Sequence, residues 1–203
     1  MTITDNPLAA LRDVDETALQ RLRGALAEKA AEAQLLDLAY RTVDSPVGPL
    51  LLVATERGLT RVAFTSQGHD DVLNRLADTV SPRVLEAPQR LDPAARELDE
   101  YFTGTRHTFD LTLDLSTTSE FRRAVQLLLP SIGYGHTVSY SELAALAGRP
   151  TAVRAVATAC ATNPLPVVVP CHRVLRGDGS LGGYLGGLDA KRTLLELESR
   201  VAA

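Results

Sequence analysis

The sequence contains few cysteines, no tryptophan and few aromatic residues of any kind. Its 203 residues include two cysteines and one methionine, and aromatic residues make up 4% of the chain. Two cysteines are too few for the disulfide framework of a small secreted domain, so we expect a reducing compartment. Cys160 and Cys171 have no companion ligands at the spacing of a zinc cluster. We therefore expect no metal and no other cofactor.

Long hydrophobic runs are also missing. No stretch of about 18 apolar residues could form a membrane-spanning helix, and the opening MTITDNPLAALRDVDE has neither the basic start nor the apolar core of a signal peptide. Hydrophobic residues make up 45% of the chain and charged residues 23%, as in ordinary globular proteins. We expect a cytoplasmic protein without membrane contact, built from one large domain or two small ones.

Positive charge is scarce and unevenly distributed, within a net charge of −4. Residues 1–115 contain 12 Lys and Arg against 19 Asp and Glu, whereas residues 116–203 contain 9 against 6. The overall charge argues mildly against nucleic-acid binding. The net charge of +3 on the second part nevertheless suggests that this part alone meets an anion.

The first 115 residues combine one helical pattern with strand-like segments. Apolar residues at helical spacing predict one helix over residues 8–36, or two helices interrupted near residues 13–16. This helix either packs on the body of the protein, which is the ordinary outcome, or serves as a partner-binding arm. Further patterns predict strands over 36–43, 49–54, 60–64 and 108–113 and helices over 69–79 and 93–103. A small α+β domain with an antiparallel sheet accounts for these elements.

The remaining residues favour helices. Residues 119–129 form one predicted helix, which a proline ends. Ser139 and Glu142 fit a capping box at the start of a second helix, which Gly148 stops, and Pro150 suits the start of a third helix that extends to about residue 161. Two short helices joined by a glycine-containing turn indicate a helix-turn-helix, although a plain antiparallel helix pair has the same spacing.

The most unusual segment is PVVVPCHRV, residues 166–174, where a cysteine follows an apolar run and precedes a histidine. The thiolate is the reactive form of cysteine, and burial alone would raise the thiol pKa, so a base or a hydrogen-bond network is needed to activate it. Direct contact between Cys171 and His172 is poor in an extended strand, where neighbouring side chains point to opposite faces. Either the chain turns sharply at Cys171 or a water bridges the two groups. Without activation Cys171 would be a buried structural cysteine, which is the ordinary interpretation of Cys160.

A glycine-rich segment, GGYLGG at residues 182–187, follows the cysteine. It lacks the spacing of a phosphate-binding loop, but its glycines allow the backbone to approach a planar ligand closely. The last predicted helix, residues 189–201, carries Glu196 and Glu198, each of which is by default a solvated surface carboxylate.

Taken together, NPLPVVVPCHRV, the preceding VSYSELAALAG and the following GGYLGGL and LLELE strongly resemble the O6-alkylguanine-DNA alkyltransferases, also called methylated-DNA–protein-cysteine methyltransferases. The close match covers residues 117–198, and SPVGPLLLVATERGLTRVAF and ELDEYFTGTRHTFDLTLDL resemble the less specific N-terminal domain of that family. The resemblance implies a helical extension at 1–36, an α+β domain at 37–115, and a mainly helical DNA-binding and alkyl-acceptor domain with a helix-turn-helix at 116–203. It implies a monomeric suicide DNA repair protein that acts on double-stranded DNA.

The resemblance also implies a function for individual residues. Cys171 would accept the alkyl group from O6 of a guanine flipped out of the duplex, because a buried thiol cannot reach a stacked base. His172 would be the base, acting through water, and Glu198 the carboxylate that orients it. The residues expected to contact DNA or substrate are Tyr140 at the phosphate and the departing guanine, Arg154 in the base stack, Asn163 at the hinge behind the recognition helix, and Arg173, Val174, Tyr184 and Leu185 around the guanine. The helix-turn-helix is expected in the minor groove.

Some positions depart from the family pattern. Leu185 stands where a serine or an arginine often occurs. Leucine can serve if the contact uses the backbone N–H, but its side chain is expected to narrow or reshape the pocket. On the recognition helix, Val153 replaces a smaller alanine and Ala157-Thr158 replaces a frequent glycine pair, so the fit to the groove changes. None of these differences removes the reacting cysteine.

Three other classes of protein fit the sequence less well than a repair protein does. A damage sensor that binds alkylated guanine without repairing it would lack the acceptor cysteine. A transcription regulator that signals through methylation would need a further DNA-binding or metal-bearing domain, for which residues 1–36 are too few. A thiol hydrolase would need an oxyanion hole and multiple turnover. Cys171 together with the helix-turn-helix pattern favours repair.

Overall fold

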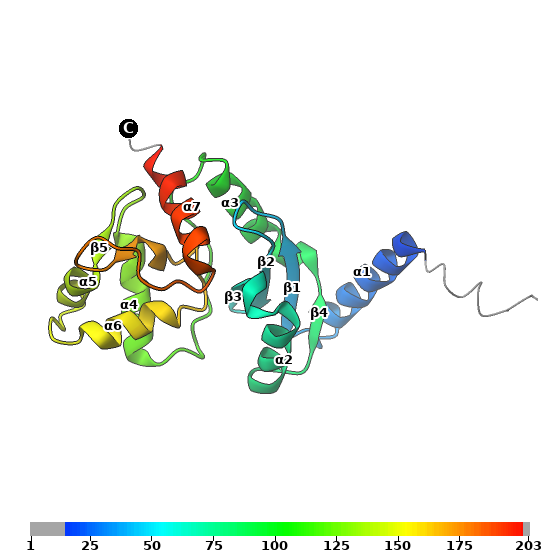
Figure 1. Ribbon diagram of the computed structural model, residues 1–203. Coiled ribbons are helices and arrows are strands. Elements are labelled where there is room, and N and C mark those ends of the chain that lie inside the picture. The colour runs from blue at the N-terminus through cyan, green and yellow to red at the C-terminus, as the bar shows by residue number, and fades with distance from the viewer. Residues whose placement is uncertain (1–14, 201–203) are drawn as a thin grey trace, which may run out of the picture.

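The computed structural model of the chain describes residues 15–200, which form a part built on a sheet and a part built of helices (Figure 1). Its helices are α1 (Glu16–Glu32), α2 (His69–Thr79), α3 (Asp92–Phe102), α4 (Glu120–Leu128), α5 (Tyr140–Leu146), α6 (Val153–Ala161) and α7 (Gly187–Ser199). Its strands are β1 (Leu38–Val43), β2 (Leu50–Thr55), β3 (Gly58–Phe64), β4 (Val84–Glu86), β5 (Val138–Ser139) and β6 (Val174–Leu175). Within these residues no helix has the length and apolar character needed to cross a membrane.

The main sheet has the strand order β3-β2-β1-β4. Strands β1, β2 and β3 are antiparallel neighbours, and β2 is apolar almost throughout because both of its faces are covered. Leu50 and Leu52 face the large core that includes α3, whereas Leu51 and Val53 face α2, as the two-residue period of a strand requires. The expected α+β class with an antiparallel sheet is confirmed, with one addition, because β4 pairs in parallel with β1.

The strand expected over residues 108–113 does not form. This segment makes a single bridge to the main sheet, between Leu59 and Leu113, with hydrogen bonds from Leu59 N to Thr112 O and from Asp114 N to Leu59 O. The alternating residues Phe109, Leu111 and Leu113 still pack against the large core. The alternation therefore reflects burial on one side of an extended segment, and it does not indicate a ladder of strand pairing.

Helix α1 is shorter than the pattern over residues 8–36. Asp15 caps its start by accepting a hydrogen bond from Thr17 N at 3.0 Å, and residues 8–14 lie outside the described residues. The helix ends at Glu32, and Gln34 has a left-handed φ of 56° that ends the helical path. Ala27 of α1 is buried in a small cluster with Leu36, Ala39 and Ala87, so α1 packs beside the sheet through a narrow contact.

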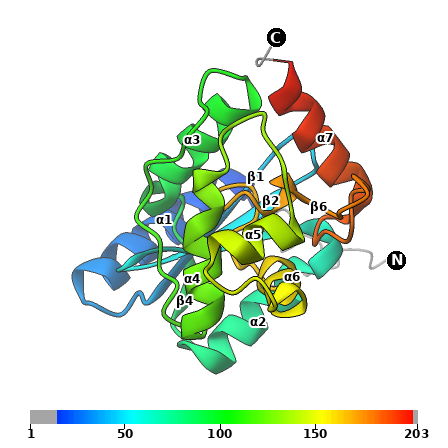
Figure 2. The same ribbon diagram turned by 90° about the vertical axis from the view of Figure 1, so that its left-hand side faces the viewer.

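The two short helices of the second part form as expected. Ser139 and Glu142 make the capping box of α5, and Gly148 has the left-handed φ of 67° that the turn after α5 requires. Figure 2 shows α5 and α6 at the end of the helical part, with α4 beside them. Pro150 does not start the next helix. Helix α6 begins at Val153, after a turn closed by the hydrogen bond from Ala152 N to Arg149 O.

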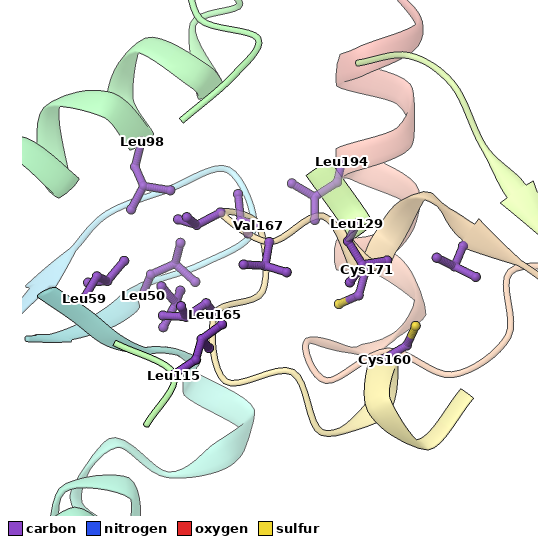
Figure 3. Packing of buried hydrophobic residues seen from close by; sticks show 14 of the residues in the cluster. Leu50, Leu59, Leu98, Leu115, Leu129, Cys160, Leu165, Val167, Cys171 and Leu194 are labelled. Carbon is purple, nitrogen blue, oxygen red and sulfur yellow. The ribbon is translucent and has the colours of Figure 1, made fainter. Parts of the chain in front are cut away.

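One large hydrophobic core connects the sheet part with the helical part. Leu50 of β2 and Leu98 of α3 share it with Leu165, Val167 and other buried residues of the second part (Figure 3). The chain between α6 and Cys171 lies at this junction, where Val62 N of β3 donates to Pro164 O at 2.9 Å. The segment that precedes the cysteine is therefore fixed by both parts of the molecule.

Candidate active site around Cys171

Cys171 starts a tight turn at the end of the buried apolar segment. Residues 171–173 form a 3-10 turn, in which Arg173 N donates to Pro170 O at 3.1 Å and Cys171 N donates to Val169 O at 2.8 Å. The chain therefore turns sharply at Cys171 and is not an extended strand there. Just before it, Val167 has a φ of 74°, a left-handed conformation that costs free energy for a β-branched residue. The surrounding core therefore holds a strained backbone directly upstream of the thiol.

Asn163 braces this turn from inside. Its side-chain amide donates to Val169 O at 2.7 Å and to Cys171 Sγ at 3.1 Å, and its carbonyl oxygen accepts from Leu165 N at 3.0 Å. Asn163 is completely buried. Burial raises the pKa of the Cys171 thiol to about 11, although the Asn163 amide acts in the opposite direction. At neutral pH the resting thiol is therefore protonated and needs a base.

His172 and Glu198 form a buried pair next to the cysteine. His172 Nε2 lies 2.8 Å from Glu198 Oε1, and neither side chain is exposed by more than 1%. Burial alone would raise the pKa of Glu198, but hydrogen bonds from His172 and Arg173 lower it to about 2. Because an ionised carboxylate only accepts hydrogen bonds, Nε2 of His172 carries the proton and donates.

The other ring nitrogen of His172 is then free to act as an acceptor. Nδ1 is buried and has no hydrogen-bond partner among residues 15–200. Burial lowers the pKa of His172, although the Glu198 carboxylate acts in the opposite direction, so the imidazole is neutral near pH 7. His172 directly follows Cys171 in the chain, and a neutral imidazole with an unprotonated Nδ1 has the protonation state that a base for the thiol needs.

Glu198 is 1% exposed and lies against His172, so the default interpretation as a solvated surface carboxylate does not apply to it. One expectation is corrected by the surroundings of this pair. Arg173 is not placed to bind DNA or substrate. Its guanidinium is buried, donates to both oxygens of Glu198 at 2.9 Å and donates to Ile132 O at 2.6 Å. The buried ion pair with Glu198 holds the Arg173 guanidinium inside the protein, so this positive charge is not available at the surface.

Cys171 lines a cavity of about 410 Å³. The lining residues are Tyr140, Ala157, Cys160, Ala161, Cys171, Arg176, Gly182, Gly183, Tyr184 and Leu185. Three of the residues expected around the guanine, Tyr140, Tyr184 and Leu185, are therefore brought together with the cysteine. Val174 is buried in β6 and does not line the cavity, and Arg154 is exposed on α6 outside it.

The sequence reasoning missed three residues at this site. Cys160, taken as an ordinary core cysteine, is buried but lines the same cavity as Cys171. Lys191 of α7 is completely buried, and its ammonium group donates to Val174 O at 2.6 Å and to Leu181 O. Tyr101 of α3 donates to Glu198 Oε1 at 2.7 Å. Only Lys191 had a signal in the sequence, because it lies at helical spacing with Leu194 of the same helix.

Comparisons with known proteins cover both parts of the chain. Residues 38–115 match the family model of the ribonuclease-like domain of 6-O-methylguanine DNA methyltransferase, and residues 120–200 match the model of its DNA-binding domain. A methylated-DNA–protein-cysteine methyltransferase from Mycolicibacterium paratuberculosis is 44% identical over 163 residues, which are 80% of this chain and 93% of the relative. One from Methanosarcina barkeri is 38% identical over 159 residues, 78% of this chain and 96% of the relative.

Solved structures give the same result for the fold. The crystal structure of Mycobacterium tuberculosis O6-methylguanine methyltransferase is 39% identical, with a TM-score of 0.71, and the match covers 80% of this chain and 93% of that one. The crystal structure of Mycobacterium tuberculosis OGT in complex with DNA is 40% identical, with a TM-score of 0.70 and the same coverage.

Proposed function

The chain belongs to the methylated-DNA–protein-cysteine methyltransferase family, and we propose that it is a suicide repair protein that flips O6-alkylguanine out of duplex DNA and transfers the alkyl group irreversibly to its own Cys171. Family membership gives the general activity, transfer of a methyl group from DNA to a protein cysteine. The observation that supports Cys171 as the acceptor is its position. It lines the 410 Å³ cavity and lies next to the His172–Glu198 pair.

The proposed reaction is a direct displacement at the alkyl carbon. Sγ of Cys171 attacks this carbon, the new carbon–sulfur bond forms, and the bond from carbon to guanine O6 breaks. The thiol proton passes through a water to Nδ1 of His172, and the departing guanine anion takes up one proton from solvent. The imidazolium then returns its proton to solvent, so overall the thiol proton replaces the alkyl group on the guanine. Because no step regenerates the thiol from the thioether, each molecule acts once.

Tyr140 is suited to supply a hydrogen bond to the departing guanine. It lines the cavity, and burial raises the pKa of its phenol, so its hydroxyl stays protonated and can donate. Donation toward O6 or N3 would stabilise the negative charge that develops on the base as the carbon–oxygen bond breaks. Gly182 and Gly183 keep one side of the cavity free of side chains, which suits a planar base.

DNA binding is proposed through α5 and α6, with α6 in the minor groove. Arg154 is exposed near the start of α6, where it can enter the base stack in place of the flipped nucleotide. Ala157 and Ala161 of α6 line the cavity, so the helix that would lie in the groove is also a wall of the site. We propose that the protein acts as a monomer in the cytoplasm.

Intact-protein mass spectrometry tests this function. The protein is incubated with duplex DNA that carries one O6-methylguanine, and we expect a gain of one methyl group that saturates at one per chain. Cys160 and Cys171 fall in the same tryptic peptide, residues 155–173, so fragmentation between them locates the group. The C171S variant should bind the same DNA and gain nothing. A methyl group on Cys160, or transfer that continues in C171S, would overturn the assignment.

The same experiment separates repair from damage sensing, because DNA that stays bound while no mass is gained would indicate a damage sensor. A second assay with an ester substrate tests the thiol hydrolase. Cleavage of many ester molecules to acid and alcohol per chain, with no lasting adduct, would indicate that class.

A further inference from the structure

Tyr101 connects the sheet part of the molecule to the catalytic pair. It lies on α3, it is completely buried, and its hydroxyl donates to Glu198 Oε1 at 2.7 Å. Glu198 lies on α7, 97 positions further along the chain. A residue of the first part therefore contacts the carboxylate that orients the proposed base in the second part.

The hydroxyl of Tyr101 shares one oxygen atom with His172. Oε1 of Glu198 accepts from Tyr101 at 2.7 Å, and the same oxygen lies 2.8 Å from His172 Nε2. Arg173 donates to both carboxylate oxygens, and Gly135 N donates to Oε2 at 3.2 Å. The negative charge of Glu198 is therefore divided among several donors, and the hydrogen bond to His172 is only one of them.

An aromatic cluster fixes the position of the Tyr101 ring. Its centroid lies 5.3 Å from Phe102, 5.3 Å from Phe109 and 6.0 Å from Tyr134. Such packing leaves the ring no alternative rotamer without opening the core. The hydroxyl is thus held at the carboxylate by the fold of the first part.

We propose that Tyr101 is a positioning residue for alkyl transfer, which holds Glu198 Oε1 in place for His172 and limits how strongly that carboxylate stabilises the protonated imidazole. The proposal rests on the function proposed above for Cys171 and His172. It assigns the sheet part of the molecule a direct influence on the reaction, beyond its contribution to the core.

The physical basis is competition for one anion. An oxygen that accepts from a neutral phenol has less electron density to offer to His172, so the imidazolium is less favoured and the imidazole stays neutral as a base. Burial and the nearby Glu198 raise the pKa of Tyr101, so its hydroxyl stays a donor at every pH at which the protein is assayed. The other charged or titratable groups that face this pair are Arg173 from the turn, Lys191 from α7, Tyr134 from the loop after α4 and Tyr184 from the glycine-rich segment.

The test compares two tyrosine-to-phenylalanine variants. In Y101F, Glu198 Oε1 accepts one hydrogen bond fewer. It therefore stabilises the protonated imidazole more strongly, and His172 becomes protonated at a higher pH. We expect the acid limb of the transfer rate, measured with O6-methylguanine duplex DNA, to move to higher pH by about one unit. On the acid limb, well below both midpoints, the rate should therefore fall by about tenfold. At neutral pH the fall should be much smaller, and DNA affinity should stay the same.

Y134F is the matched control. Tyr134 belongs to the same aromatic cluster, but its buried hydroxyl has no hydrogen-bond partner among the described residues. Removing this hydroxyl deletes no contact to Glu198, so the pH midpoint should not move.

Three outcomes would overturn the proposal. They are a Y101F rate that is lower by the same factor at every pH, an unchanged rate, and equal shifts in Y101F and Y134F. If Y101F does not fold, 3-fluorotyrosine at position 101 retains the ring and makes the hydroxyl a stronger donor. The acid limb should then move to lower pH, and no movement would refute the proposal. Failure of the unaltered protein to transfer any methyl group would instead refute the proposed function.

Discussion

Two glutamates of the last helix have the same side chain and opposite environments. Glu196 is exposed. Glu198, two positions further along and on the opposite side of the helix, is 1% exposed and accepts hydrogen bonds from His172 and Arg173. In E198Q the charge of Arg173 would stay buried without its partner. We expect the free energy of unfolding at pH 7 to fall by about 3–5 kcal/mol, measured by urea denaturation. Methyl transfer should be lost, because the amide cannot hold His172 as a carboxylate does.

E196Q is the control for this variant. It makes the same chemical change on the same helix, and its unfolding free energy should stay within about 0.5 kcal/mol of the unaltered protein. Equal stability of E198Q and E196Q would show that the buried ion pair contributes little.

The sequence indicated some of these side chains more clearly than others. A cysteine after an apolar run and before a histidine is unusual enough to mark Cys171 and His172. Helical spacing does not separate Glu196 from Glu198, and the resemblance to a family was needed to single out the second. Tyr101 had no local signal, because its partner lies 97 positions away and only the packing of α3 beside α7 brings them together. Arg173 was misassigned because a sequence does not show that an arginine is buried.

Helices were easier to predict than strands. Capping residues and glycine stops are local, so the patterns place α2, α3, α4 and α5 close to their observed bounds. Strands β4, β5 and β6 have only three, two and two residues, too few to show a two-residue period. These short strands form because tertiary folding brings each beside a strand far along the chain, β4 beside β1 and β5 beside β6.

The glycine-rich segment packs closely against Phe64 of β3. A Cβ atom on Gly186 would lie 2.7 Å from Cε1 of Phe64, although its φ of −81° is open to any residue. Phe64 is 2% exposed and packs edge-to-face on Tyr184 at 5.6 Å. In G186A we therefore expect the free energy of unfolding to fall by about 1–3 kcal/mol through overpacking. Transfer should also slow, because Tyr184 moves with the segment.

G177A provides the comparison for G186A. A Cβ atom on Gly177 would meet no atom within 4 Å. Its stability should therefore change by less than about 0.5 kcal/mol, measured by thermal or urea unfolding. If both variants unfold at the same midpoint, the close approach of Gly186 to Phe64 does not constrain the segment.

The acidic first part and the basic second part of the chain are packed together. They share the large core, and the first part supplies Phe64 beside the glycine-rich segment and Tyr101 at Glu198. The contrast in charge therefore concerns the surfaces, because only the second part is proposed to meet DNA. The contrast in charge was visible in the sequence. The shared core was not, because a core depends on which faces of β2 and α3 are left for other elements to cover.

The buried pair at the junction predicts how the stability of the chain depends on pH. The folded protein lowers the pKa of His172 below its ordinary value of 6.5, so the unfolded chain binds the proton more readily. Stability should therefore fall as the pH drops below about 6.5. Glu198 has a folded pKa of about 2 against an ordinary 4.5, so its contribution is complete above pH 4.5 and is lost as the pH falls from there toward 2.

Protonation of both groups thus destabilises the folded protein in acid. The His172 contribution is lost below about pH 6.5, and the Glu198 contribution is lost between pH 4.5 and 2. Urea unfolding at pH 7.5, 5.5 and 4 should give decreasing free energies, and further loss should follow below pH 4.5. The E198Q variant, which starts from a lower stability, should lack the loss that comes from Glu198, since an amide does not titrate. A stability that is constant from pH 7.5 to 5 would contradict the lowered pKa of His172, and with it the neutral imidazole that the proposed reaction requires.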